Sequence, residues 1–380
     1  LVLGDALTER LIPHGHPGVL LRPQSTEEVA AALRLCNDAG QPVVPYGGLT
    51  GLVEATTADE SEVAISLERM NAIEEIDIAS RTMTVQAGVP LQVVQEAAEA
   101  EGLLFPLDIG ARGSATIGGN VATNAGGNRV IRFGMMRDQI LGMEVVLADG
   151  TVLSSMNKII KNNTGYDLKQ LFIGSEGTLG IVTRLVLKLR SAPTSQNMAF
   201  LAASTFDQVT TLLNRLDAGL GGSLSAFEVM WSDYYELVTK PPAAGQPPVA
   251  HGYGFYILVE ALGGDEDADS ERFLAVLSEA MEEGIVADGA IAQSQGERDT
   301  MWAIRDDVGQ VAQFRPVFAF DIIVPLNHMN SYVEEMKGAL TEKWPSNQCM
   351  VFGHLGDGNL HVVVGVGDKG AKQAVEAVVY

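Results

Sequence analysis

The 380-residue sequence lacks several features that define whole classes of protein. It has two cysteines, Cys36 and Cys349, too few for a disulfide framework or a cysteine-based zinc cage, so we expect a reduced, cytoplasmic setting. No apolar run approaches the ~18 residues that a transmembrane helix needs. The first ten residues, with Asp5 and Glu9, lack the basic and then apolar order of a signal peptide, and we expect none.

Positive charge is also scarce. Lys and Arg number 25 against 48 Asp and Glu, which gives a formal net charge of −23. A surface this acidic repels phosphate backbones, so we expect no nucleic-acid partner. No basic amphipathic helix argues for peripheral membrane association, which stays open. At 46% hydrophobic and 19% charged residues, the chain is otherwise typical of a globular protein of two or three domains.

Glycine is abundant, at 41 residues, and gathers in three polar loops, Pro45–Leu52, Ser114–Gly127 and Gly174–Ile181. Backbone N–H groups in such loops can form anion-binding nests. For the first loop taken alone, an ordinary tight turn is an equal alternative. The second loop combines Gly, Asn, Ser and Thr with little side-chain bulk, a composition more typical of a cofactor loop. The third adds a carboxylate, Glu176, that could anchor a ribose or a ring N–H.

Hydrophobic periodicity predicts alternating strands and helices in the first half of the chain. Ser25 and Glu28 have the spacing of a capping box, and the helix that they begin is expected to end at Gly40. Ser191–Asn197, with a proline and no periodicity, predicts a linker. Two β-α-β blocks follow it and predict an antiparallel sheet with helices on one face, as in ferredoxin-like domains.

A second kind of site is predicted between His354 and His361. Asp357 and Gly358 are typical of a two-residue hairpin turn, which would place the two histidines directly opposite each other. Opposed side chains lie roughly 4.5–5.5 Å apart at Cβ, so the two imidazoles could bind one divalent metal. Two hydrogen-bonded hairpin histidines are the structural alternative. At Arg305, on a predicted helix, the planar guanidinium suits a carboxylate, whereas a solvated helix arginine is the alternative.

Six segments, in their order and spacing, resemble the FAD-linked D-2-hydroxyacid dehydrogenases of the vanillyl-alcohol oxidase / p-cresol methylhydroxylase superfamily. That family includes D-lactate and D-2-hydroxyglutarate dehydrogenases and the glycolate oxidase FAD subunit. The resemblance implies an α+β fold, with a two-subdomain FAD-binding domain over 1–190. A ferredoxin-like antiparallel-sheet substrate domain is implied over 191–380, without the family's C-terminal return segment. The six segments are Pro45–Leu52, Phe105–Asp108, Ala115–Gly127, Asn162–Asp167, Gly174–Thr183 and His354–His361.

The resemblance implies that FAD is bound, and bound non-covalently, because the first loop has no histidine of the kind that tethers flavin in some members of the superfamily. The residues implied as FAD ligands lie in or beside the three glycine loops. They are Pro45, Tyr46, Gly47, Gly48, Leu49, Thr50, Gly51, Leu52, Pro106, Asp108, Ser114, Thr116, Ile117, Gly118, Gly119, Asn120, Thr123, Asn124, Gly126, Gly127, Glu176, Gly177, Gly180 and Ile181.

The resemblance also implies roles in the second half of the chain. His354 and His361 are expected to bind a divalent metal, Zn or Mn, and Arg305 to hold the substrate carboxylate. Arg305, Asn359 and His361 are the expected catalytic residues. The family's Glu-His-Gly segment, which supplies a third metal ligand and the base, is absent from this sequence.

Three positions depart from the pattern of 2-hydroxyglutarate-type relatives. Gly309, Ala319 and Val363 stand where those relatives carry Thr, Lys and Asn. The departure favours a smaller or more apolar 2-hydroxyacid.

The implied reaction is oxidation of a D-2-hydroxyacid to the 2-oxoacid, by hydride transfer to flavin N5 with metal-assisted activation of the hydroxyl. A quinone, a cytochrome or an electron-transfer flavoprotein is expected to accept the electrons, and a homo-oligomer is expected. One alternative is the FAD subunit of a multi-subunit glycolate oxidase, inactive alone. The other is an alcohol or lactone oxidase of the same superfamily.

Overall fold

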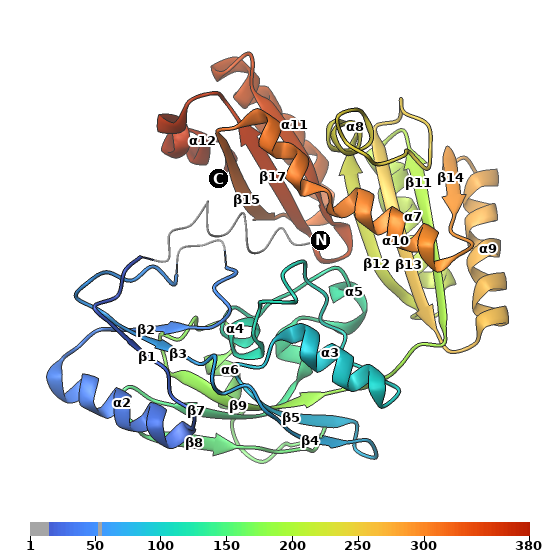
Figure 1. Ribbon diagram of the computed structural model, residues 1–380. Helices are drawn as coiled ribbons and strands as arrows, with labels where there is room; N and C mark the ends of the chain where they lie inside the picture. The colour runs from blue at the N-terminus through green and yellow to red at the C-terminus, as the bar shows by residue number, and fades with distance from the viewer. Residues whose placement is uncertain (1–14, 52–54) are drawn as a thin grey trace. The chain divides into compact units, whose positions relative to one another are not determined.

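The computed structural model describes residues 15–51 and 55–380, and the chain divides into two compact units (Figure 1). The first unit runs to Ala192 without residues 130–132, and the second contains those three residues and everything from Pro193 onward. No helix within the described residues is both long enough and apolar enough to cross a membrane.

The predicted linker is shorter than expected. Strand β10 (Arg190–Ser191) occupies its first residue, and β11 (Ser195–Ala203) takes its last three. The sequence predicts a strand over Met198–Ala203, which is most of β11, but not β10, which has two residues, nor the polar start of β11 around Gln196.

The first unit holds, among its described residues, a parallel sheet in the order β1-β3-β2 and an antiparallel sheet in the order β4-β5-β9-β7-β8. A separate pair joins β6 to β10. The bounds of these elements and their helices are β1 (Val19–Leu21), α2 (Thr26–Ala39), β2 (Val43–Tyr46), β3 (Val63–Ser66), β4 (Ile73–Asp77), β5 (Thr82–Gln86), α3 (Leu91–Ala100), β6 (Leu103–Leu104), α4 (Ile117–Ala122), η1 (Met136–Gln139), β7 (Ile140–Val146), β8 (Val152–Ser155), α6 (Lys169–Phe172) and β9 (Ile181–Lys188). Helix α5 (Val130–Phe133) lies between α4 and η1 in the chain, and its first three residues belong to the second unit.

Helix α2 begins and ends where the sequence predicts. The Ser25 hydroxyl accepts a hydrogen bond from the Glu28 N–H, and Gly40 closes the helix with a left-handed φ of 64°. The apolar face of α2 packs on both sheets of the unit, through Val29 and Leu33. The helix therefore joins the two sheets into one body.

The second unit is built, within the described part of the chain, on an antiparallel sheet in the order β14-β11-β13-β12-β16-β17-β15. Every pairing recorded in it is antiparallel. Its further elements are α7 (Phe206–Gly219), β12 (Leu224–Trp231), α8 (Ser232–Thr239), β13 (Phe255–Gly263), α9 (Glu266–Glu282), β14 (Asp288–Ile291), α10 (Gln295–Asp306), η2 (Val308–Phe314), β15 (Val317–Ile323), α11 (Leu326–Lys343), β16 (Gln348–His354), η3 (Leu355–Asp357), β17 (Asn359–Gly365), η4 (Lys369–Ala371) and α12 (Lys372–Val379).

Helices cover both faces of this sheet, so the prediction of helices on one face is wrong. Helices α7, α9, α11 and α12 form one core with alternate strand residues such as Leu201 and Val229. Helices α8 and α10 form a second core with the intervening residues, such as Phe200 and Met230. All eight residues of β12 are buried as a result.

The hairpin that carries the two histidines also differs from its prediction. His354 lies opposite Asn359, and Phe352 lies opposite His361. The turn contains the short helix η3 and Gly358 (φ 80°), because four residues rather than two connect the strands. The predicted direct pairing of His354 with His361 is therefore wrong by two residues. Because side chains alternate with a period of two, both histidines stay on one face, as diagonal neighbours.

Candidate functional site

The first glycine loop leaves the end of β2 with unpaired backbone donors. Among the described residues, no acceptor receives a hydrogen bond from any backbone N–H between Gly47 and Gly51. Leu49 adopts a left-handed φ of 54°. A run of free N–H groups in a turned backbone is the arrangement that binds an anion. Leu52, the last predicted ligand of this loop, lies outside the described residues.

The second loop packs directly against the first. A Cβ on Gly48 would lie 2.1 Å from the Ser114 carbonyl oxygen, and one on Gly47 would lie 2.9 Å from Thr116 Oγ1. Only glycine permits so close an approach of two backbones. Thr116 also caps α4, since its hydroxyl accepts a hydrogen bond from the N–H of Gly119 at 3.3 Å.

The third loop joins the same cluster through hydrogen bonds to α4. The N–H of Gly174 donates to the Val121 carbonyl at 3.0 Å, and that of Glu176 donates to Ala122 at 2.8 Å. A Cβ on Gly177 would lie 2.4 Å from Pro45 Cγ. The structure thus brings together three loops that are 60 to 130 positions apart in the sequence. A cavity of about 230 Å³ opens beside them, lined in part by Pro45 and Gly177–Ile181.

Several predicted FAD ligands have structural partners instead of a free polar group. The Asp108 carboxylate lies 3.2 Å from Arg129 Nη1. A Cβ on Gly118 would lie 2.7 Å from Ala87 Cβ, one on Gly180 would lie 2.8 Å from Val145 Cγ1, and Ile181 is in the core. The remaining predicted ligands of the first two loops are Tyr46, Thr50, Ile117, Thr123, Asn124, Gly126 and Gly127, whereas Pro106 follows β6, outside the three loops.

One buried side-chain nitrogen of the second loop has no hydrogen-bond acceptor in the described part of the chain. Asn120 is 4% exposed, and its Nδ2 has no hydrogen bond to any described residue. A buried amide left without an acceptor is costly unless a ligand supplies one. Together with the free N–H groups of the first loop, this amide fits a long ligand that carries phosphate and hydroxyl oxygens. The loops therefore fit FAD.

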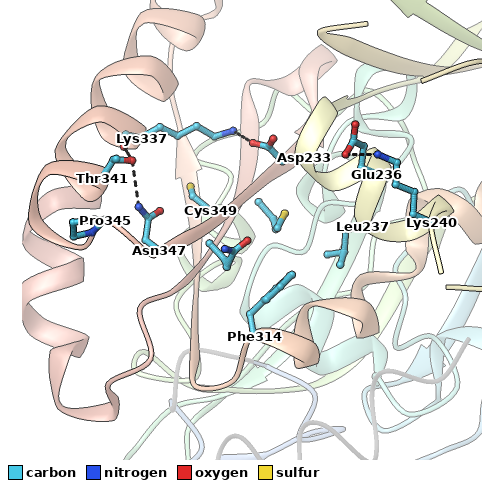
Figure 2. A pocket seen from close by; sticks show the side chains of 12 residues that line it. Asp233, Glu236, Leu237, Lys240, Phe314, Lys337, Thr341, Pro345, Asn347 and Cys349 are labelled. Atoms are coloured by element: carbon cyan, nitrogen blue, oxygen red, sulfur yellow. Dashed lines mark hydrogen bonds and ion pairs between the residues drawn. The ribbon is translucent and has the colours of Figure 1, made fainter. Parts of the chain in front are cut away.

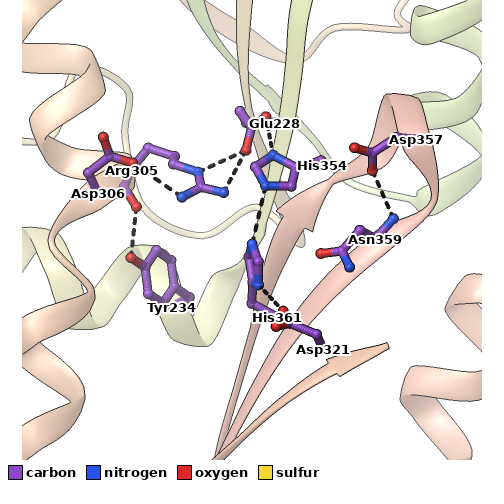
Figure 3. A network of polar contacts seen from close by, with 9 residues as sticks. All are labelled: Glu228, Tyr234, Arg305, Asp306, Asp321, His354, Asp357, Asn359 and His361. Atoms are coloured by element: carbon purple, nitrogen blue, oxygen red, sulfur yellow. Dashed lines mark hydrogen bonds and ion pairs between the residues drawn. The ribbon is translucent and has the colours of Figure 1, made fainter. Parts of the chain in front are cut away.

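The second unit gathers a chain of polar side chains around Glu228, at the centre of β12 (Figure 3). Glu228 is 1% exposed, and each of its two oxygens has its own partner. Oε2 accepts a hydrogen bond from Arg305 Nε at 2.8 Å, and Oε1 lies 2.7 Å from His354 Nδ1. His361 continues the chain, with its Nε2 3.3 Å from that of His354 and its Nδ1 2.6 Å from Asp321.

The two carboxylates determine which imidazole nitrogens are free. Each Nδ1 faces an ionised carboxylate, which only accepts hydrogen bonds, so in a neutral ring this contact favours the proton on Nδ1. The Nε2 lone pairs of His354 and His361 then point at each other across 3.3 Å. Such a pair is stabilised by a cation or by an extra proton between the nitrogens. A carboxylate behind a ligating histidine is also the usual support of a metal site.

Arg305 lies in the last turn of α10 and is 6% exposed. Besides Glu228, its guanidinium contacts Asp306 through Nη1 at 3.2 Å, and the Phe352 ring lies 5.3 Å away. Its Nη2 also lies 2.8 Å from Glu228 Oε2, but the angle is unfavourable, so no described residue accepts a hydrogen bond from it. Tyr234 donates its hydroxyl hydrogen to the Arg305 carbonyl at 2.8 Å and holds the helix end.

Burial and charge act in opposite directions on these groups. Burial raises the pKa of Glu228, but its electrostatic interactions and hydrogen bonds with His354 and Arg305 outweigh burial and hold that pKa below its usual value. Burial and the charge of Arg305 lower the pKa of His361, despite its hydrogen bond to Asp321. The site therefore favours an ionised Glu228 and a neutral His361, the form that ligates a metal.

Asn359 supplies a further unpaired group. It pairs with His354 across the hairpin, and its buried Oδ1 has no hydrogen-bond partner among the described residues. Across the described residues, no cluster of three or more His, Cys, Asp or Glu could hold a metal ion. The metal at His354 and His361 stays a prediction that rests on two ligands.

Glu228 and Asp321 are the two residues of this site that the sequence analysis missed. Each is an acid inside an apolar strand, in Phe227-Glu228-Val229 and Phe320-Asp321-Ile322. A charged residue in such a run is rare in a core unless it is paired, and that signal was available.

The second unit also contains a cavity of about 490 Å³, which lies between α8 and α11 (Figure 2). Its lysines are already paired, Lys337 with Asp233 and Lys240 with Glu236. Burial raises the pKa of Cys349, on its wall, to about 11, so this thiol is inert at neutral pH.

Two family models match the chain. One, described as an FAD binding domain, matches residues 17–155, and the other, described as the C-terminal domain of FAD linked oxidases, matches residues 192–380. These matches agree with the resemblance identified from the sequence.

Curated relatives carry one recurring name. The D-2-hydroxyglutarate dehydrogenase of Xanthomonas citri pv. viticola is 39% identical over 95% of this chain and 75% of its own length. The mitochondrial enzyme of that name from Bos taurus is 40% identical over 92% of the chain and 64% of its length. The one from Arabidopsis thaliana is 38% identical, over 94% and 64%. The chain thus spans less than two thirds of the length of these two mitochondrial relatives.

Solved structures agree on the fold. An alkyldihydroxyacetonephosphate synthase gives a TM-score of 0.77 at 17% identity, over 95% of this chain and 71% of that one. A p-cresol methylhydroxylase gives 0.72 at 13% identity, over 98% and 82%. The predicted α+β fold of the vanillyl-alcohol oxidase type is confirmed.

Proposed function

The chain belongs to the FAD-linked oxidase family that contains the D-2-hydroxyglutarate dehydrogenases, and we propose on that basis that it oxidises a D-2-hydroxyacid to the 2-oxoacid with FAD. The observation that carries the proposal is the connected array of Arg305, Glu228, His354 and His361. It sets an anion-binding group beside two free imidazole nitrogens. A 2-hydroxyacid carries its carboxylate and hydroxyl on adjacent carbons and matches both.

In this proposal Arg305 binds the substrate carboxylate. Its buried Nη2 forms an ion pair with Glu228 but no hydrogen bond within the described residues, so a ligand oxygen would supply the acceptor that it lacks. The orphaned Oδ1 of Asn359 accepts a hydrogen bond from the same substrate. Both groups lie on rigid elements, a helix end held by Tyr234 and a hairpin strand, which favours one orientation of the substrate.

His354 and His361 hold the hydroxyl end. Their Nε2 atoms fit a divalent cation such as Zn or Mn, which would supply Lewis acidity and lower the pKa of the hydroxyl. FAD supplies the hydride acceptor. The oxidation releases one hydride from C2 and one proton from the hydroxyl.

Two observations bear on the identity of the 2-hydroxyacid, and they point in opposite directions. The names of the relatives point to D-2-hydroxyglutarate. Gly309, Ala319 and Val363 lack the polar groups that the sequence analysis expects for a second carboxylate, and they point to a smaller or more apolar acid. We propose the class, a D-2-hydroxyacid, and leave its side chain to the experiment. A cytoplasmic location and the electron acceptor stay predictions.

The test is an anaerobic absorption titration of the purified protein with matched D- and L-2-hydroxyacids, including lactate and 2-hydroxyglutarate. We expect the oxidised flavin band to bleach with D-acids and not with their L-isomers. Flavin that binds but is bleached by no D-acid contradicts the proposal. A protein that cannot be loaded with FAD contradicts the cofactor assignment as well.

A second candidate is an FAD subunit that is active only with partner subunits. The observation in its favour is that the described residues offer two metal ligands and no third. Such a protein would bind FAD yet stay oxidised with every hydroxyacid until a partner is added. An alcohol or lactone oxidase is less well supported, because it would need neither Arg305 nor the histidines. In that case His354→Ala would leave turnover intact.

A further inference from the structure

Glu228 contacts both Arg305 and His354, although the proposed reaction gives it no role of its own. It touches neither substrate nor metal in the assigned roles, yet it is the most buried carboxylate of the array, at 1% exposure, in a strand with every residue buried. Burying a carboxylate is unfavourable unless both of its oxygens are satisfied. Here they are satisfied by two different functional residues, Arg305 and His354. A single side chain therefore orients both.

The backbone fixes this arrangement. Glu228 and His354 are direct neighbours in the register of β12 with β16. On the other side, Arg305 reaches the second oxygen from the end of α10, where Tyr234 anchors its carbonyl. The carboxylate cannot rotate without losing the Arg305 hydrogen bond. Its Oε1 is consequently locked on His354 Nδ1.

We propose that Glu228 is a positioning residue that holds His354 in the Nδ1-protonated tautomer, with its Nε2 lone pair free and directed at His361 Nε2. The inference rests on the proposed function only in taking those two nitrogens as metal ligands. Asp321 contacts His361 in the same way, but its side chain is 63% exposed and no arginine constrains it among the described residues. The two acids therefore offer a matched comparison.

The substitutions Glu228→Gln and Asp321→Asn compare a carboxylate that an arginine holds in place with one that is free to rotate. An amide has one accepting oxygen and one donating NH2 group. In Glu228→Gln the oxygen must face Arg305, because arginine cannot lose its proton, so the NH2 group faces His354 and forces the proton onto Nε2. That proton makes a hydrogen bond to His361 and closes the metal site. In Asp321→Asn the amide is free to turn its oxygen toward His361, and the tautomer is kept.

The first readout is the affinity of chelator-treated, FAD-loaded protein for Co²⁺, followed by its visible absorption. We expect Glu228→Gln to weaken Co²⁺ binding by about 10- to 100-fold and Asp321→Asn to weaken it by less than about threefold. The double variant Glu228→Gln/Arg305→Met removes the constraint on the amide and both buried charges. It should recover most of the lost affinity. Equal Co²⁺ affinity of Glu228→Gln and wild type, or no recovery in the double variant, overturns the inference.

The second readout needs no metal. Nitrogen-15 spectra of histidine-labelled protein report which ring nitrogen of His354 carries the proton. We expect Nδ1–H in the wild type and in Asp321→Asn, and Nε2–H in Glu228→Gln.

Wild-type His354 protonated on Nε2 overturns the inference whatever the enzyme does. If Glu228→Gln does not fold, the double variant and Asp321→Asn are compared with wild type, and Nε2–H in the double variant refutes the proposed constraint. Wild-type protein that binds no Co²⁺ refutes the metal site alone, since the spectra still decide the tautomer.

Discussion

Replacement of Gly48 by alanine tests whether the contact between the first and second loops builds the FAD site. The new Cβ would lie 2.1 Å from the Ser114 carbonyl oxygen and 2.8 Å from Ala115 Cα, both backbone atoms that cannot rotate away. Gly48 does not have a left-handed φ, so the effect is steric and not conformational. Restoring ordinary contact, which begins at 3.4 Å, requires the loops to separate by about 1.3 Å (3.4 minus 2.1).

The cost of that shift falls on the FAD-bound state. Overpacking of this kind costs about 1–3 kcal/mol, which corresponds to a loss of roughly 5- to 150-fold in FAD affinity if the FAD-free loop relaxes. Gly51 is the matched control. It lies three residues on in the same loop, and a Cβ there would meet no atom of the described residues within 4 Å. We therefore expect Gly51→Ala to bind FAD within about twofold of the wild type.

The assay is the return of flavin fluorescence when each purified variant is diluted, with circular dichroism to establish that the protein is folded. Gly48→Ala that binds FAD as tightly as the wild type refutes the claim that loop contact shapes the site. Equal losses in Gly48→Ala and Gly51→Ala refute the steric explanation, because only one of the two positions is crowded.

Three further predictions concern the second unit. Arg305→Lys should raise KM for the hydroxyacid by at least about tenfold in steady-state assays, because a lysine replaces the planar fork with a point charge; an unchanged KM contradicts carboxylate binding there. Treatment with a chelator should abolish reduction by hydroxyacid while the flavin absorbance remains, and added Zn²⁺ or Mn²⁺ should restore it; full activity in the chelator speaks against the metal. In a Cys36→Ala background, Cys349 should resist iodoacetamide at pH 8.5 and react once unfolded, because a thiol with a pKa of about 11 is only ~0.3% thiolate at that pH. Because this pKa is raised in the folded state, the corresponding stability is lost as pH rises above ~8.5. Fast labelling of the native protein would contradict the burial of Cys349.

The parts of the fold that depend on local chemistry could be predicted from the sequence. Helix α2 begins and ends at Ser25 and Gly40, since a cap and a left-handed glycine act on neighbouring residues alone. The three glycine loops were identified for the same reason. Their convergence was not derivable from spacing, because it depends on contacts such as that of Gly177 with Pro45. Resemblance to a known family supplied that step.

The prediction of helices on one face of the larger sheet was wrong, although the sequence indicates that both faces are covered. Residues 198–203 are all buried, and they form a continuous apolar run instead of an alternating one. Such a run is typical of a strand covered on both faces. The same reasoning locates Glu228, an acid in a fully buried strand. Its partners come from α10 and β16, so only the folded chain shows why it is tolerated.

The error in the histidine hairpin shows why a wrong register can leave a correct site. The predicted turn of two residues contains four, which moves the pairing by two and replaces His354 opposite His361 with His354 opposite Asn359. Because strand side chains repeat every two residues, an even shift keeps both imidazoles on one face, and their Nε2 atoms still lie 3.3 Å apart. An odd shift would have placed one of the two imidazoles on the opposite face of the sheet. Whether the spacing of the two histidines is shifted by an even or an odd number decides which face of the sheet they share, and the length of the turn decides which residues pair directly. A sequence can therefore specify which side chains meet even where it does not specify their exact pairing.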